Sequence, residues 1–196
     1  MQMIKVVMGL LLVGCVNSAS ALPFSFNSHD VPEDIPENPT TTLGNTYSYM
    51  MTIGAAGIIS DLNVYVDIDH TWTGDLDIYI SDLLTGTTVH LFDQHGGSGN
   101  DITGVTFDDE AATVISSADA PFGPGTFRGV QSLTAFDGLS LASVWELTIV
   151  DNYHADVGTL WNWGIRGETA DVPEPGNLVL IGLGILGISL ARKRHM

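Results

Sequence analysis

The sequence predicts an all-β fold, arranged as an antiparallel sandwich or barrel. Apolar and polar residues alternate over short segments, and stretches rich in glycine and proline separate these segments. No segment in the body of the chain has a convincing helical period. Many short strands joined by tight turns are typical of sandwiches and barrels, so we expect one domain of this class.

The strands can be placed in order along the chain. Leu62, Val64, Val66 and Ile68 alternate with polar residues, as a strand with one buried face requires. Turn-forming residues fill 96–100 and 121–125. The predicted strands are 62–68, 76–80, 88–92, 105–107, 145–150 and 161–165.

The four tryptophans divide by the same alternation. Trp145 shares a face with the apolar residues of its predicted strand, and Trp161 and Trp163 share a face with Ile165, so we expect these three tryptophans in the core. Trp72 lies in a turn rich in threonine and aspartate. We therefore expect Trp72 to be exposed and able to stack on a sugar or a partner.

The N-terminus has the three parts of a secretory signal peptide. Lys5 is followed by an uncharged apolar run, and Ala19 and Ala21 form an A-x-A cleavage site. Leu12 to Cys15 also resembles the lipobox of bacterial lipoproteins, in which the cysteine becomes a lipidated N-terminus. We favour Cys15 as an apolar residue that leaves with the signal, after which neither a disulfide nor a thiolate site can form.

The C-terminus carries a second export feature. The Pro-Glu-Pro motif, an apolar stretch over 178–191 and a final basic cluster resemble the PEP-CTERM sorting signal of exopolysaccharide-producing Gram-negative bacteria. The residues concerned are Pro173, Glu174, Pro175, Arg192, Lys193 and Arg194. This resemblance implies an exosortase as partner, a short transmembrane helix as membrane contact before processing, and delivery to the cell surface or extracellular matrix. An ordinary tail anchor is the alternative, although the stretch is short for a permanent span.

These features divide the chain into six parts. The lead-in contains four prolines, so we expect it to be extended and poorly packed, with its last part as a candidate edge of the fold. The parts are a signal peptide (1–21), the lead-in (22–43), a β-sandwich (44–168), a linker with the Pro-Glu-Pro motif (169–177), a hydrophobic sorting helix (178–191) and a basic tail (192–196).

The body of the chain is strongly acidic. The net charge of the chain is −17, and Arg128 and Arg166 are the only lysine or arginine residues between Leu22 and Asp171. Such a surface repels nucleic acid and anionic lipid, so we expect neither as a partner of the body. Bound calcium or a saline habitat would relieve the repulsion.

The aspartates are candidate calcium ligands, because calcium binds hard oxygen atoms. Four of them surround one predicted strand-turn-strand, although Trp72 and Ile78 occupy the positions at which an EF-hand requires glycine and glutamate. Solvated acidic loops are the alternative interpretation. In order of preference the candidates are Asp67, Asp69, Asp75, Asp77, then Asp108, Asp109, Asp151 and Asp156.

No catalytic machinery is recognisable in the sequence. A G-x-S-x-G elbow and an H-E-x-x-H pair are both missing, and His70 beside Asp69 is interpreted as a structural hydrogen-bonding group. Residues 96–101 match the start of a calcium-binding nonapeptide, but a single copy is better explained as a turn between strands. We therefore expect a protein without catalytic residues.

The order of several motifs resembles the P/Homo B domain over about Asp34 to Gly167. The motifs are Ile58 to Val64, His70-Thr71-Trp72-Thr73-Gly74-Asp75-Leu76, Gly86-Thr87, Gly96-Gly97, Phe107-Asp108-Asp109, Trp145-Glu146-Leu147, and Asp151 to Gly158 with Leu160 and Trp163. Leu83-Leu84-Thr85 departs from the family's usual Ser-Pro before the Gly-Thr turn. The resemblance implies a sandwich of jelly-roll type, which follows the catalytic domain of proprotein convertases and bacterial subtilisin-like proteases without cutting peptides itself.

Together these observations predict an exported, non-catalytic module, stabilised by calcium, that binds a macromolecule such as a surface protein or contributes structure. Two alternatives remain open at this stage. The module could bind exopolysaccharide through Trp72, or it could act as an accessory domain of a separate subtilisin-like serine protease, as the resemblance alone suggests.

Overall fold

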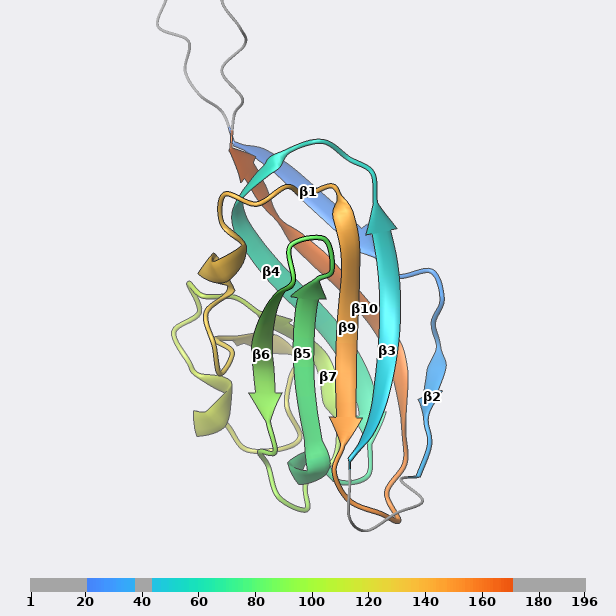
Figure 1. The fold of residues 1–196 in the computed structure, drawn as a ribbon. Coiled ribbons are helices and arrows are strands. Elements are labelled where there is room, and N and C mark those ends of the chain that lie inside the picture. The colour runs from blue at the N-terminus through green and yellow to red at the C-terminus, as the bar shows by residue number, and fades with distance from the viewer. Residues whose placement is uncertain (1–20, 38–43, 171–196) are drawn as a thin grey trace, which may run out of the picture.

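Two sheets packed face to face form the body of the protein (Figure 1). The computed structural model describes residues 21–37 and 44–170. The larger sheet contains β1 (Leu22–Asn27), β2 (Glu33–Ile35), β4 (Ile58–His70), β7 (Ile102–Phe107), β8 (Gly125–Phe127) and β10 (Gly158–Ala170). The smaller sheet contains β3 (Asn45–Ile53), β5 (Leu76–Asp82), β6 (Thr87–Asp93) and β9 (Ser143–Asp151).

The strand order has jelly-roll topology. The larger sheet has the order β1-β10-β4-β7-β8, with β2 also on β10, and the smaller has the order β3-β9-β5-β6. With the short β2 and β8 set aside, the first strand pairs with the last, the second with the last but one, and so on to the central hairpin. This pairing order is that of a jelly roll, which contains two Greek keys, and it confirms the predicted antiparallel jelly-roll sandwich. The two separate sheets exclude a closed barrel.

The core fills the space between the sheets. Inward-facing side chains from β4, β5 and β9 are fully buried in it, and Trp145 packs edge-on against Phe136, with ring centroids 5.1 Å apart. Trp163 is buried too, so the core positions of Trp145 and Trp163 are confirmed. All six predicted strands exist, each extended by up to several residues.

Trp161 is a correction to the sequence prediction. Its side chain is 48% exposed, whereas both Leu160 and Trp163 are fully buried. The pairing of β10 with β4 shifts register between Leu160 and Asn162, which inserts one extra residue on β10. This β-bulge reverses the alternation, so Trp161 points outward although Trp163 points inward.

The lead-in is extended, as the sequence predicts, and the correction concerns only its packing. Its first residues form β1 at the edge of the larger sheet, and Phe24 and Phe26 pack against the core. Ile35 in β2 is fully buried, so this stretch is better packed than its four prolines indicate. Pro23 is tolerated because an edge strand leaves one side of its backbone without a partner. Residues 38–43 lie outside the described residues.

The chain between β7 and β9 covers the β6 edge of the smaller sheet. It contains the 3₁₀ helices η2 (Ile115–Ser117) and η3 (Leu133–Phe136). The backbone N–H groups of Val130 and Gln131 donate to the carbonyls of Leu91 and His90 on β6. A covered edge protects the sheet from pairing with another chain, and it also fixes the backbone of β6.

Candidate functional site

Three turns meet at one end of the sandwich, which we call the acidic end. They are residues 71–75, which include the 3₁₀ helix η1 (Thr73–Asp75), residues 94–101, and residues 152–157. Backbone hydrogen bonds join them, with Thr73 donating to Gly99 at 2.8 Å and Thr71 donating to Val157 at 3.1 Å. The turns therefore form one unit, and 96–101 is the turn between strands that the sequence predicts.

Three of the predicted ligands lie in or directly beside this unit. Asp75 and Asp151 are buried, with 6% and 0% of their surfaces exposed, and Leu76, the residue after Asp75, pairs with Asp151 across the sheet. The Asp156 side chain forms a hydrogen bond with Asp75 and accepts one from the Thr71 hydroxyl at 2.8 Å. Asp75, Asp151 and Asp156 are named the carboxylate triad below.

The triad changes the titration of Asp75. Burial first, and then the charges of Asp156 and Asp151 and the hydrogen bond that the protonated Asp75 carboxyl donates to Asp156, raise the pKa of Asp75 from 3.8 to about 6. Among the described residues, no cation opposes this shift. A divalent cation bound here would remove the repulsion that raises the pKa, and carboxylate oxygens are suitable ligands for calcium.

We expect the stability of the calcium-free protein to fall as the pH rises from about 4 to about 6. The folded state holds the proton of Asp75 in this range while the unfolded state has lost it, so the ionisation of Asp75 costs about 2 to 3 kcal/mol above pH 6. Urea unfolding in chelator at a series of pH values measures this loss. Asp75→Asn should remove most of it, and an identical pH profile for wild type and variant would contradict the assignment.

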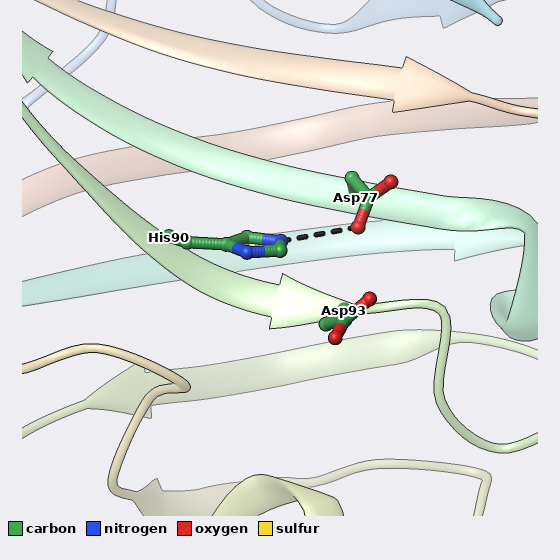
Figure 2. Close-up of side chains that lie close together, drawn as sticks. All are labelled: Asp77, His90 and Asp93. Carbon is green, nitrogen blue, oxygen red and sulfur yellow. Dashed lines mark hydrogen bonds and ion pairs between the residues drawn. The ribbon is translucent and has the colours of Figure 1, made fainter.

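Asp77 belongs to a neighbouring group on the outer face of the smaller sheet. Its Oδ1 lies 3.1 Å from Nε2 of His90, and its Oδ2 accepts hydrogen bonds from the side-chain amides of Gln94 at 3.1 Å and Asn152 at 2.8 Å. Asp93 completes the group, since one donor atom each from Asp77, His90 and Asp93 lie within 4.8 Å of one another (Figure 2).

Sequence reasoning missed His90 and Asp93. They are three residues apart, so simple alternation would place them on opposite faces of the strand. A register shift in the β5–β6 pairing lets Leu91 and Phe92 both be buried, and His90 and Asp93 then face outward together. Two adjacent large apolar residues in an otherwise alternating strand are the signal that could have indicated this bulge.

Asp67 and Asp69 lie elsewhere, on the outer face of the larger sheet. Both alternate with the buried residues of β4. Asp67 accepts a hydrogen bond from the backbone of Gly104 at 3.2 Å, and Asp69 accepts one from Nε1 of Trp161 at 2.7 Å. The structure therefore does not bring Asp67, Asp69, Asp75 and Asp77 together into one cluster.

Asp108 and Asp109 follow the end of β7 that points away from the acidic end. Phe107, the residue before them, pairs with Val64 in the middle of β4, whereas Ile102 at the start of β7 pairs with Ile68 near the acidic end. Asp109 accepts hydrogen bonds from the Ser132 hydroxyl and the Thr134 backbone at the start of η3, and Asp108 accepts one from the backbone of Glu110. These contacts shape the loops, and the two residues are separate from the carboxylate triad.

An open pocket of about 240 Å³ adjoins the acidic end on the side of the larger sheet. Asp69 contributes to it and bonds the exposed Trp161. Trp72 is 41% exposed, as predicted, and it precedes η1. The pocket is lined by Asp69, His70, Thr71, Asn100, Asp101, Val157, Gly158 and Thr159.

His70 has the structural surroundings that the sequence predicts. The side chain is buried, and Nδ1 lies 3.0 Å from the carbonyl oxygen of Trp72. Burial lowers the pKa of His70, while the hydrogen bond to Trp72 and the nearby charges of Asp156 and Asp101 oppose this change. The ring thereby fixes the turn between β4 and η1.

The predicted targeting residues mostly lie outside the described residues. Ala19 falls there, as do all six residues of the sorting motif, while Ala21 is exposed and directly precedes β1. In the described part of the chain, no helix is long and apolar enough to cross a membrane.

Two families match the sequence. The proprotein convertase P-domain matches residues 59–167, and the PEP-CTERM protein-sorting motif matches residues 171–194. Both agree with the resemblances found in the sequence, and the P-domain match covers more than half of the chain. No curated protein sequence matches this chain.

Two solved structures from Aeromonas sobria align with this chain at low sequence identity. One is a complex of a serine protease with its chaperone (15% identity, TM-score 0.42), and it covers 77% of this chain. The other is the serine protease itself (16% identity, TM-score 0.38), and it covers 76% of this chain. This chain spans 28% of the length of either matched chain.

Proposed function

Because this chain belongs to the proprotein convertase P-domain family, we propose that it is a non-catalytic binding module stabilised by calcium at the carboxylate triad. The sorting motif makes it an exported substrate of an exosortase, delivered to the cell surface or matrix of a Gram-negative bacterium. P-domains accompany a protease without cutting peptides, and the same accessory character is expected here.

One observation carries the calcium proposal. Asp75 lies in η1, Asp151 ends β9 and Asp156 lies in the turn that follows, and the charges of the last two raise the pKa of Asp75, which also shares a hydrogen bond with Asp156; Asp75 and Asp151 are buried. Like charges this close are costly unless protonated or neutralised by a cation. Calcium supplies that charge and accepts a flexible set of oxygen ligands, in which water would complete the shell.

Thermal unfolding in excess chelator and in millimolar calcium, at fixed ionic strength, tests the proposal. Calcium at one hundred times its dissociation constant should stabilise the fold by about 2.7 kcal/mol, which raises the midpoint by several degrees. Asp156→Asn should abolish the rise, because it removes one ligand from a partly exposed position.

Asp93→Asn is the matched control, since Asp93 is an acid outside the triad. It should keep the calcium response of the wild type. A response that survives Asp156→Asn, or no response in the wild type, would contradict the calcium site.

Carbohydrate binding is a second candidate function, and the exposed Trp161 beside the open pocket favours it. Sugars bind by stacking on aromatic rings and by hydrogen bonds to polar groups, and Asp69, Asn100 and Asp101 supply such groups in the pocket. The acidic surface favours a neutral polysaccharide. Full affinity of both Trp161→Ala and Trp72→Ala for extracted exopolysaccharide would exclude this function.

An accessory role towards a separate subtilisin-like protease rests on family membership alone. Purified protein added to the secreted proteases of its own bacterium should then lengthen their half-life. An unchanged half-life would remove this candidate.

A further inference from the structure

We propose that Asp77, His90 and Asp93 form a binding site for a transition-metal ion of the zinc type on the outer face of the smaller sheet. This site is separate from the proposed calcium site and does not depend on it. Figure 2 shows the imidazole of His90 pointing from β6 towards the carboxylate of Asp77 on β5, with Asp93 close to the end of β6.

The β5–β6 hairpin positions all three donors. Asp77 and Asp93 are direct partners in the pairing of the two strands, and His90 is the partner of Tyr79. The bulge at Leu91 places His90 and Asp93 on the same face. Donors held by adjacent paired strands keep their spacing better than donors on loops.

The spacing of the donors suits a tetrahedral ion. Two ligand atoms about 2.0 to 2.1 Å from one zinc ion lie about 3.3 Å apart. Nε2 of His90 and Oδ1 of Asp77 are 3.1 Å apart, and one donor atom each of Asp77, His90 and Asp93 lie within 4.8 Å of one another. The Asp93 side chain is exposed and can rotate to bring a carboxylate oxygen within bonding distance of the ion. Water would then occupy the fourth position around the ion.

Neighbouring side chains orient Asp77 and His90, the two less exposed ligands. Gln94 and Asn152 donate to Oδ2 of Asp77, so its Oδ1 remains directed at His90. The ring of Tyr79 stacks on that of His90 with centroids 4.2 Å apart. Such outer contacts fix the direction of metal ligands and raise affinity.

The imidazole decides the class of ion. Calcium and magnesium prefer oxygen ligands alone, whereas one nitrogen with two carboxylates suits zinc and its first-row neighbours. The side chains of His90 and Asp77 are only 17% and 11% exposed, so their donors are partly shielded from competing water. Nε2 binds the ion when the ring proton resides on Nδ1.

Zinc titration of the full-length chain, purified without a polyhistidine tag, tests the site. Calorimetry should give one zinc ion per chain, and excess calcium should not displace it. Cobalt in place of zinc should give the visible absorption of a four-coordinate ion. His90→Gln should lower the zinc affinity at least tenfold, and Asp93→Asn, a change at an exposed position, should also lower it.

Three controls separate this site from others. His154→Gln changes an exposed histidine outside the group and should leave zinc affinity unchanged, while Asp156→Asn should remove the calcium response and keep zinc binding. Thermal midpoints in chelator establish that each variant is folded. No binding by the wild type, or binding that survives both His90→Gln and Asp93→Asn, would overturn the zinc site without bearing on calcium.

Discussion

Replacing Trp145 with alanine is expected to destabilise the fold by about 3 to 5 kcal/mol. Trp145 is fully buried near the start of β9, packs against Phe136, and donates a hydrogen bond from Nε1 to the carbonyl of Leu141. The loss combines the burial of a large ring with the cavity left behind. This is a large share of the roughly 5 to 15 kcal/mol that stabilises a typical domain.

Trp161→Ala is the matched control, because it removes the same side chain from a position that the β10 bulge turns outward. It loses one exposed hydrogen bond to Asp69 and should cost less than about 1.5 kcal/mol. Guanidinium unfolding measures both variants, and Trp145→Phe provides a milder change if Trp145→Ala does not fold. Equal losses at the two positions would show that the bulge is misplaced.

Replacing Gly96 with alanine is expected to cost about 2 to 5 kcal/mol. Gly96 has φ +91°, and a Cβ there would lie 2.5 Å from the Thr73 hydroxyl and 2.7 Å from the ring of Phe122. The substitution therefore combines the penalty for a left-handed backbone, about 1 to 2 kcal/mol, with overpacking of about 1 to 3 kcal/mol. The contact with Thr73 also links it to the turn that holds Asp75.

Gly86→Ala separates the two causes. Gly86 has φ +75° in the β5–β6 turn, and apart from Gly86 and its two chain neighbours no atom lies within 4 Å of the place that a Cβ would occupy there. This variant should lose only the conformational part, about 1 to 2 kcal/mol. Denaturant midpoints compare the pair, and a loss at Gly96 no greater than that at Gly86 would contradict the close packing of residues 71–75 and 94–101.

Alternation along the chain predicts much of this fold. The apolar residues of β4, β5 and β9 face the core as expected, because in each of these strands they recur at every second position and so share the face towards the other sheet. The alternation fails at Trp161 and at Leu91-Phe92, where a bulge adds one residue and reverses the faces. Bulges depend on the pairing partner, which a single strand's pattern does not contain.

The candidate site could be predicted less completely, for a topological reason. Asp69 and Asp77 are only eight residues apart, but β4 and β5 belong to different sheets, so their outward side chains face opposite sides of the sandwich. Asp75 remains between them in the connecting turn and meets Asp156 instead. Contacts between residues far apart in sequence follow from the strand order, and the jelly-roll order came from the family resemblance.

Terbium luminescence tests the carboxylate triad most directly. Terbium replaces calcium at oxygen sites and emits when a nearby excited aromatic ring transfers energy to it, and Trp72 lies three residues before Asp75. The expected result is emission that saturates at one terbium per chain, is displaced by calcium, and disappears in Asp156→Asn but not in Asp93→Asn. Emission unaffected by Asp156→Asn, or none at all, would contradict a cation site at Asp75, Asp151 and Asp156.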